Sequence, residues 1–400
     1  MQLHQAENTP IQLTVIPKSN LGSAKTPQFR ARWIEVDELR SRVDAWESLA
    51  QNSLRTNVAF EPNFLLPALE HLATESVRVL IVEDVGVESQ SGLIGLAPIE
   101  SKSIYRLPFK AAEVWKHDQC YDTTPLLHAQ YADEAWRLMC SMLKADRFSL
   151  LSLDTVSGEA DVDCVFKSVE QKQGIVRFQR DRYERTAFVP AETAADYMQE
   201  HVPKSIRKKN NRMFRRLEDR GMVSWESSDE SSDFDQLTSD FLRIEKSGWK
   251  GREGTALGST APTKAFFEEM IRASAKVGKA KFLSLKLDGR PIAMLSDIQS
   301  GQFVYCFKTA YDEEFSRFSP GRQAEVKNIE NLHQNGVFLG DSCATAGNST
   351  INRIWGQKLI IQNLILSLTP GLSRVAVKAL PMIQSAVHRL RKDDGPSVDS

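Results

Sequence analysis

Three short apolar segments separated by two tight-turn dipeptides lie close together in the second half of the chain. The segments are 282–287, 291–298 and 303–309, and the dipeptides between them are Asp288-Gly289 and Ser300-Gly301. Such pairs favour hairpin turns, because glycine takes the positive φ that these turns need. The spacing therefore predicts a three-stranded antiparallel meander, which restricts the fold more than any other feature of the sequence.

Helical and strand patterns on both sides place the meander within a longer order of elements. A short strand and two helices are expected before it, and a helix, a strand and a last helix are expected after it. In order, these are 222–225, 232–246 and 263–277, followed by 321–334, 337–340 and 349–368. The order β-α-α-β-β-β-α-β-α indicates the α/β class, with a mixed central sheet flanked by helices.

The first half of the chain shows the same order of elements. Strands are expected at 32–36, 77–85, 93–99, 111–116 and 148–153, and helices at 37–50, 61–74, 131–145 and 159–173. No repeat of the sequence itself accompanies this order, so the duplication is inferred from the elements alone. We expect a polar tail over 1–28, one module over 29–190, a second module over 191–372, and a C-terminal helix and polar tail over 373–400.

Composition narrows the functional classes. The formal net charge of -1 gives no general attraction to nucleic acid or to anionic membranes. The five cysteines contain no CxxC pair, which argues against a disulfide framework and a zinc site and favours a reducing, cytoplasmic compartment. No run of 18 apolar residues is present, so no membrane span is expected, and no metal site is predicted.

Motifs in the second half carry a resemblance to a known family. Tyr311-Asp312 ends the third strand of the meander, Phe318-Ser-Pro-Gly321 precedes the next helix, and Asn335-Gly336 and Asp341 follow it. In order and spacing they resemble the acetyltransferase family that includes the bacterial cellulose-biosynthesis protein CelD. The resemblance extends over 204–357 and, less closely, over 30–190. It implies tandem GNAT-like modules of the FemAB-like type.

The resemblance also implies a site for acetyl-CoA or another acyl-CoA. In a GNAT-like site the diphosphate lies at the N-terminus of the helix after the fourth strand, where free N–H groups and the helix dipole favour negative charge. The residues expected to bind the cofactor are Lys308, Ser319, Pro320, Gly321 and Arg322. The usual signature [Q/R]-x-x-G-x-[G/A] is not met, since Phe318 and Gln323 stand at its first and last positions. An ordinary Ser/Pro helix start is the alternative interpretation.

Acyl transfer needs a base for the acceptor and an acid for the thiolate that leaves. Asp341, at the end of a strand, is the first candidate for the base, and Glu245 and Asp312 are the next. Tyr305 and Tyr311 are the candidates for the acid. For each of them a structural hydrogen bond or a helix cap is the competing explanation.

The segment between the first two helices of the second module has an unusual composition. Trp249, Lys250 and Arg252 lie among glycines, so the segment can fold over an anionic or sugar-like substrate. The two cations would then pair with negative charge on the substrate, and the indole would stack on it. A solvated connector is the alternative. We predict that these three residues bind the substrate.

Two basic segments remain. The run 204–220 carries eight Lys and Arg residues against two acidic ones, which indicates a solvated helix face or a site for a CoA phosphate, a lipid phosphate or tRNA. The stretch 375–391 mixes apolar and basic residues, and packing on the body of the protein is favoured over contact with a membrane surface.

Three functional hypotheses follow. The first is an acyl-CoA-dependent transferase acting on an amine or hydroxyl acceptor in polysaccharide or cell-envelope biosynthesis, as the resemblance implies. The second is a Fem-like transferase that takes its acyl group from charged tRNA, motivated by the basic run. The third is a non-catalytic component of an exopolysaccharide assembly. A small-molecule, saccharide or lipid-linked acceptor is expected, and DNA is not.

Overall fold

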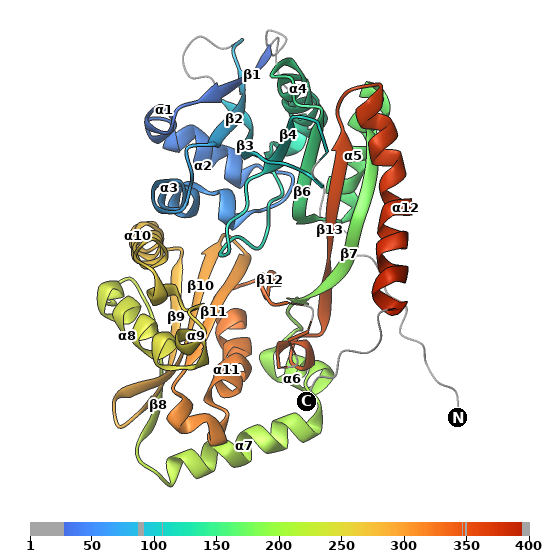
Figure 1. The fold of residues 1–400 in the computed structure, drawn as a ribbon. Coiled ribbons are helices and arrows are strands. Elements are labelled where there is room, and N and C mark those ends of the chain that lie inside the picture. Colours follow the sequence, from blue (N-terminus) through green and yellow to red (C-terminus); the bar gives the residue numbers. More distant parts are fainter. Residues whose placement is uncertain (1–27, 87–91, 106, 346, 349, 394–400) are drawn as a thin grey trace.

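A computed structural model describes residues 28–86, 92–105, 107–345, 347–348 and 350–393. Except for Gln28, the polar tail expected over 1–28 lies outside the described residues. The described chain forms one mixed α/β structure in which a single long sheet runs from end to end with helices on both sides (Figure 1). None of the described helices has the length and apolar character needed to cross a membrane.

The sheet contains thirteen strands. In chain order they are β1 (Phe29–Ile34), β2 (Val77–Asp84), β3 (Leu93–Ser101), β4 (Ala111–Val114), β5 (Leu126–Leu127), β6 (Leu150–Ser157), β7 (Val176–Phe188), β8 (Val223–Ser227), β9 (Ala280–Leu287), β10 (Arg290–Ser300), β11 (Phe303–Tyr311), β12 (Leu339–Asp341) and β13 (Gln357–Ser367). Across the sheet the order is β1-β2-β3-β4-β6-β13-β7-β12-β11-β10-β9-β8, and β5 pairs with β3.

Twelve α-helices connect the described strands. They are α1 (Val36–Arg40), α2 (Val43–Gln51), α3 (Pro62–His71), α4 (Ala132–Ala145), α5 (Ala160–Gln173), α6 (Ala194–His201), α7 (Lys204–Glu218), α8 (Phe234–Ser247), α9 (Trp249–Arg252), α10 (Ala261–Lys276), α11 (Pro320–Gln334) and α12 (Leu372–Asp393). Short 3-10 turns lie at Val58–Phe60, Ala129–Tyr131, Leu257–Ser259, Glu313–Phe318 and Ile351–Arg353.

The predicted meander is confirmed as β9, β10 and β11, which pair antiparallel in sequence order. At the first turn Asp288 and Gly289 both have positive φ, of 49° and 77°, which is the conformation of a type I′ hairpin. At the second turn Gly301 has a φ of 57°. The two dipeptides therefore set the register of this part of the sheet.

The two halves of the chain exchange their last strands. β7, which ends the first half, pairs at Ala187 and Phe188 with β12 of the second half. β13, from the end of the second half, lies between β6 and β7 and pairs antiparallel with both. The sheet is therefore continuous across the junction, and the division of the chain into modules at 190 and 372 stays a prediction.

The helix predicted over 349–368 is wrong, because this stretch holds a 3-10 turn and the strand β13. A strand in the centre of a sheet is covered on both faces, so apolar residues stand at successive positions and the alternation of a half-exposed strand is lost. In β13, Leu364, Ile365 and Leu366 are all buried. The strands β5 and β7 and the helices α6 and α9 were not predicted from the sequence; β7 and α6 lie at the junction of the two predicted modules, and α9 lies between the predicted helices 232–246 and 263–277.

Alternate residues of β10 separate two layers of the second half. Met294 and Ile298 lie in the core cluster that contains residues of α8 and α10. Ala293 and Leu295 lie in another cluster, with Ala324 of α11. Since neighbouring residues of a strand point to opposite faces, α8 and α10 cover one face of the meander and α11 covers the other.

The first half packs on the α10 side of the second half. α3 contacts α10, and Asn63 donates a hydrogen bond from Nδ2 to Ser274 Oγ over 2.8 Å. Phe64 lies edge-on to Tyr305 and Phe307 of β11, with ring centroids 6.2 and 5.7 Å away. These contacts place the first half directly against the strand that carries most of the predicted site.

Candidate active site

β11 and β12 run side by side for only three residues and then separate. Their parallel pairing covers Phe303 to Tyr305 on one strand and Leu339 to Asp341 on the other. Beyond Tyr305, β11 continues to Tyr311, and a bulge shifts its register against β10 between Ser296 and Ile298. This bulge re-aims side chains on the β10 side, while on its other edge β11 pairs with β12 no further than Tyr305.

Asp341 ends β12 in a fully engaged state. Its Oδ2 forms an ion pair with Arg185 Nη2 over 2.5 Å, and its Oδ1 accepts a hydrogen bond from Cys343 N over 2.8 Å. The Asp341 and Arg185 side chains are each only 3% exposed. Arg185 comes from β7 and also donates to Tyr121 O over 2.7 Å. Asp341 therefore joins β12 to β7 and, through Arg185, to Tyr121, and a proton on its carboxylate would weaken the ion pair.

The Tyr305 hydroxyl faces the same junction. It accepts a hydrogen bond from Tyr121 N over 2.6 Å, and the Tyr305 side chain is buried. Burial and the neighbouring Cys343 thiol raise the pKa of Tyr305 well above its usual value, so the phenol keeps its proton at neutral pH. Cys343 is also buried, has a φ of 52°, and holds a thiol whose pKa burial raises. Tyr305 is therefore present as a protonated donor.

Lys308 is the amine at the bulge of β11. The pKa of Lys308 is lowered to about 8, chiefly by burial; the negative charge of Glu245 opposes this shift and the positive charge of Lys250 adds to it. A substantial fraction of this amine is therefore neutral near physiological pH. Sequence reasoning assigned Lys308 to the cofactor, and its electrostatic setting also gives it the capacity to take a proton.

Glu245 and Lys250, two further predicted residues of this region, contact each other. Glu245 is buried and pairs with Lys250 Nζ over 3.1 Å, while its Oε2 accepts from Leu257 N over 2.8 Å. Lys250 Nζ also donates to Thr309 O of β11 over 3.2 Å. Lys250 therefore contacts the backbone of β11 next to the predicted site for the acyl group.

The segment after α8 forms the short helix α9 and is fixed to the end of β11. Glu313 accepts from Trp249 N over 2.7 Å and pairs with Arg252 Nη1 over 2.8 Å. Trp249 is 44% exposed, and it lines a small cavity together with Glu245, Lys250 and Tyr311. Of the predicted substrate contacts, both cations are thus already paired, whereas the exposed indole lines the cavity.

Helix α11 begins where the sequence predicted the diphosphate. Ser319 has a φ of 53° and makes no side-chain cap, and Pro320 and Gly321 are buried. A Cβ atom on Gly321 would lie 3.0 Å from Tyr311 Cδ1, so the glycine permits the ring of Tyr311 to approach the first turn. The free N–H groups of the first turn have no intrahelical partner.

A cavity of about 240 Å³ opens beside this helix start, between α7, α11 and the turn at Ile351–Arg353. The lining residues are Ser205, Ile206, Lys209, Arg322, Thr350 and Arg353. Three of the six are cations and none carries a carboxylate. Among the described residues, Arg322 Nε and Nη2 find no hydrogen-bond partner although they are buried, and burial lowers the pKa of Arg322. An anionic ligand would satisfy this guanidinium.

A buried acidic pair, Asp297 of β10 and Glu325 of α11, lies between α11 and the face of the meander that α11 covers. Asp297 accepts from Asn328 Nδ2 over 3.1 Å, and Glu325 accepts from Thr309 Oγ1 over 2.6 Å. Burial, and to a lesser extent the negative charge of Glu325, raises the pKa of Asp297 to about 7. Burial also raises the pKa of Glu325 to about 7. No motif in the sequence pointed to this pair.

The structure thus brings most of the predicted site together around β11. Tyr305, Lys308 and Asp341 lie at the point where β11 and β12 separate, and Glu245, Lys250 and Tyr311 lie at the end of β11. Asp312, a further candidate for the base, instead caps the turn at Glu313–Phe318 and pairs with Arg290. Arg185, Tyr121 and Arg353 were missed, because they lie outside the predicted motifs, whereas Lys209 belongs to the basic run 204–220 that was considered for a CoA phosphate.

Comparison with known proteins agrees with the α/β fold described above. Residues 204–344 match the family model described as an acetyltransferase (GNAT) domain. No curated protein sequence matches the chain. The crystal structure of FemX is similar, with a TM-score of 0.54 at 12% identity over 85% of this chain and 97% of that one.

Two further structures share the fold at low identity. The C-terminal domain of a putative lysylphosphatidylglycerol synthetase from Agrobacterium fabrum gives a TM-score of 0.53 at 10% identity, over 87% of this chain and 96% of that one. A conserved protein of unknown function from Bacteroides thetaiotaomicron gives 0.51 at 9% identity, over 82% and 97%. The chain therefore shares its fold with FemX, and residues 204–344 match the model of a GNAT-type acetyltransferase domain.

Proposed function

We propose that the protein transfers an acyl group from acyl-CoA to an amine or hydroxyl acceptor. The observation that carries this proposal is the cationic cavity at the start of α11, where a partly buried Arg322 has two nitrogen atoms without partners. The negative charge of the CoA diphosphate suits the positive end of the nearby helix dipole and the charge of Arg322, and Lys209 and Arg353 add further positive charge to the cavity.

From that cavity the arm of CoA would run to the released edge of β11. A thioester placed at the bulge would lie near Lys308 and Tyr305, and no metal is needed for its chemistry. We propose that neutral Lys308 accepts the proton of the acceptor and that Tyr305 protonates the departing thiolate. In this scheme Asp341 positions Arg185 and the backbone of Cys343, and the acceptor enters beside Trp249.

Binding of CoA to purified protein tests the donor. We expect acetyl-CoA or a longer acyl-CoA to raise the melting temperature, since a ligand that binds only the folded state stabilises it. Arg322→Ala should weaken CoA binding by roughly tenfold, because it removes charge-assisted hydrogen bonds to phosphate. Arg216→Ala is the matched control, since Arg216 is an exposed cation on α7 that does not line the cavity.

Two results would count against the donor assignment. If CoA does not raise the melting temperature, the donor assignment is wrong. An equal loss of CoA affinity in Arg322→Ala and Arg216→Ala would indicate only general attraction of anions. If CoA binds but no saccharide or envelope acceptor causes release of the thiol, the result favours the hypothesis that the protein is a non-catalytic component of an exopolysaccharide assembly. The choice of such acceptors rests on the family resemblance of 303–341.

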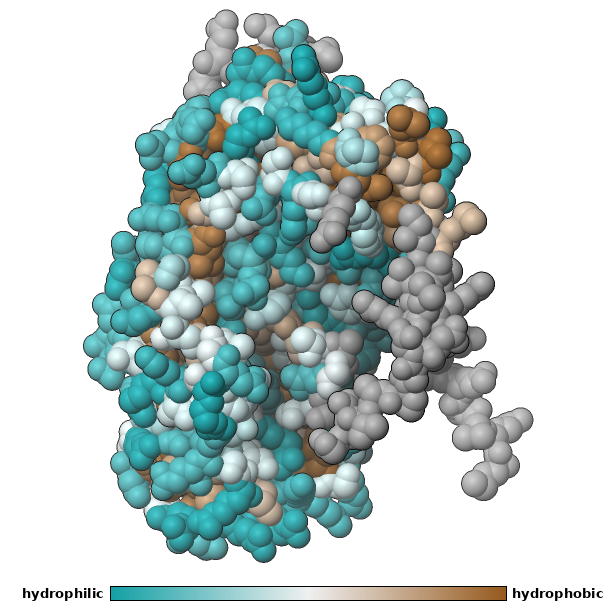
Figure 2. Space-filling view, viewed as in Figure 1, coloured by the Kyte–Doolittle hydropathy of each residue, from teal (hydrophilic) through white to brown (hydrophobic). Residues whose placement is uncertain are grey.

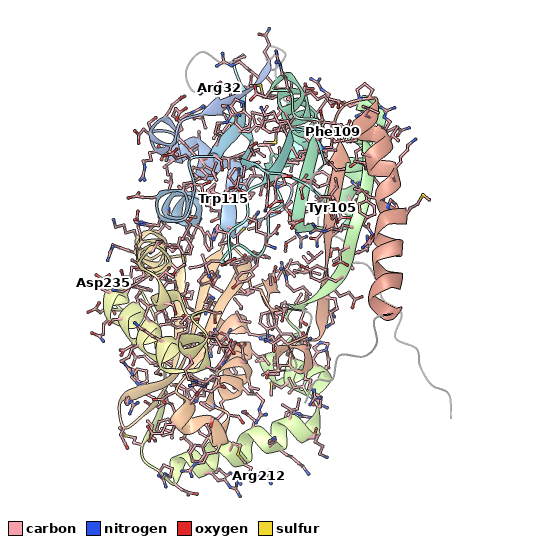
Figure 3. All side chains as sticks on the ribbon, in the orientation of Figure 1. Arg32, Tyr105, Phe109, Trp115, Arg212 and Asp235 are labelled. Atoms are coloured by element: carbon pink, nitrogen blue, oxygen red, sulfur yellow. The ribbon has the colours of Figure 1, made fainter. Side chains whose placement is uncertain are left out.

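One observation favours a second donor, an aminoacyl-tRNA. The basic run 204–220 forms α7 and its C-terminal turn at the rim of the molecule, and Arg212 projects from it into solvent (Figure 3). Among the ion pairs of the described residues, none involves a cation of this run. A tRNA donor would show steep loss of binding with salt, and neutralising Arg212, Arg215 and Arg216 together would abolish it.

A further inference from the structure

Helix α12 carries an apolar stripe on the side that faces away from the protein. Leu372, Val375 and Met382 are 78%, 63% and 77% exposed. Their spacings of three and seven residues place them on one face of the helix. Figure 2 shows apolar surface gathered at the upper right of the view, over the first part of α12. Scattered apolar residues are normal on a surface, but several in line on one helix mark a contact site.

The opposite face of α12 packs on the sheet and holds the helix in place. Val377 and Leu380 are buried in a cluster with Phe178 of β7 and Ile365 of β13. Arg374 also donates to Gly174 O through Nη2. The helix is therefore fixed to the sheet through one face only, and folding does not explain the apolar residues on the other.

The charge of α12 identifies what can cover the stripe. The one acidic residue of α12 is its last, Asp393, and its Lys and Arg residues are Arg374, Lys378, Arg389, Arg391 and Lys392. Lys378 is exposed beside the stripe. Apolar residues flanked by cations, on a helix that cannot span a bilayer, are the features of a helix that lies in the plane of a membrane surface.

We propose that the outward face of α12 docks on an anionic lipid surface. Leu372, Val375 and Met382 would enter the boundary between headgroups and acyl chains, while Lys378 contacts lipid phosphates. Tyr105, which is 54% exposed and follows Ile104 of the same cluster, adds an amphipathic ring at this side of the molecule. A second copy of the chain is disfavoured as the occupant, because a two-fold contact would bring two helices of like charge together.

Vesicle binding of the full-length protein tests this proposal. We expect it to float with vesicles of phosphatidylcholine that contain roughly 30% phosphatidylglycerol, and to stay free with pure phosphatidylcholine. The variant L372S/V375S/M382S should lower the partition coefficient by at least about tenfold, since it removes the inserted apolar groups. Lys378→Glu should lower it by about fivefold or more through charge alone.

The control is M222S/V277S, which replaces exposed apolar residues of the same kind away from α12, 69% and 49% exposed. It should bind vesicles like the wild type, and all variants should keep the wild-type melting temperature. The proposal is overturned if the wild-type protein ignores the anionic vesicles, or if both serine variants lose binding equally. It is also overturned if the wild type is a dimer that the α12 variant converts to monomers, because a second copy then covers the stripe.

Discussion

Arg185 and Asp341 form a buried ion pair that joins the two halves of the chain. Arg185 belongs to β7 and Asp341 to β12, 156 residues further on, and each side chain is 3% exposed. The pair lies beside the last paired residue of β11, where β11 and β12 separate. A contact of this kind couples the junction of the halves to the geometry of the candidate site.

The first prediction concerns the stability of this junction. Arg185→Met leaves the Asp341 carboxylate buried without its partner, and loss of one partner of a buried pair costs about 3–5 kcal/mol of unfolding free energy. Urea unfolding measures the change. Replacing both partners, as in R185M/D341L, should recover much of the loss, because no unpaired charge then remains.

Arg252→Ala is the matched control for this experiment. Its ion pair with Glu313 is of similar length, but the Arg252 side chain is 63% exposed. We expect no measurable change in the free energy of unfolding, since solvent already screens the pair. Equal losses in the Arg185 and Arg252 variants would show that burial at the junction is not the source of the stability.

Local signals predicted the elements of the fold well, and non-local pairing set the rest. The turns at Asp288-Gly289 and Ser300-Gly301 act through the backbone of a few residues, so they could be recognised from the sequence. The place of β13 depends on β6 and β7, about 200 residues earlier. Strand preference is set largely by such neighbours, and no local pattern in 357–367 reveals them.

The second prediction tests the proposed base. Because the pKa of Lys308 is lowered to about 8, its neutral fraction grows as pH rises through that value. We expect kcat/KM for acyl transfer to rise with pH along a limb with an apparent pKa near 8. Lys308→Arg should lose this limb and most of the activity while CoA binding persists, since a guanidinium keeps its proton. An unchanged pH profile in Lys308→Arg would exclude Lys308 as the base.

The third prediction concerns the segment that fixes α9. A Cβ atom on Gly251 would lie 1.8 Å from Lys246 O, so Gly251→Ala must displace the backbone of α9 and with it the contact from Lys250 to Thr309 O. We expect a loss of about 2 kcal/mol or more in unfolding free energy and a higher KM for the acceptor. Gly258→Ala is the control, because its Cβ meets nothing closer than 3.8 Å.

The candidate site shows the same limit of local inference. Motifs in one stretch of sequence identified Tyr305, Gly321, Arg322 and Asp341, because strand ends and helix starts have recognisable residues. Arg185 reaches the site from β7, so no spacing within 303–341 contains it. The roles of residues also depend on burial, which the sequence does not display.

The last prediction uses the acidic pair beneath α11. Asp297 is 5% exposed, and burial, together with the smaller effect of the negative charge of Glu325, raises its pKa to about 7. Its folded-state pKa exceeds that of the unfolded chain, so the folded state binds more protons between about pH 4 and pH 7 and loses stability as pH rises through this range. Asp297→Asn removes this term. Relative to wild type, the variant should gain on the order of 2 kcal/mol between pH 5 and pH 8. Asp235→Asn, at a side chain that is 75% exposed, should show no such gain. Parallel pH dependences for Asp297→Asn and wild type would mean that Asp297 is ionised throughout.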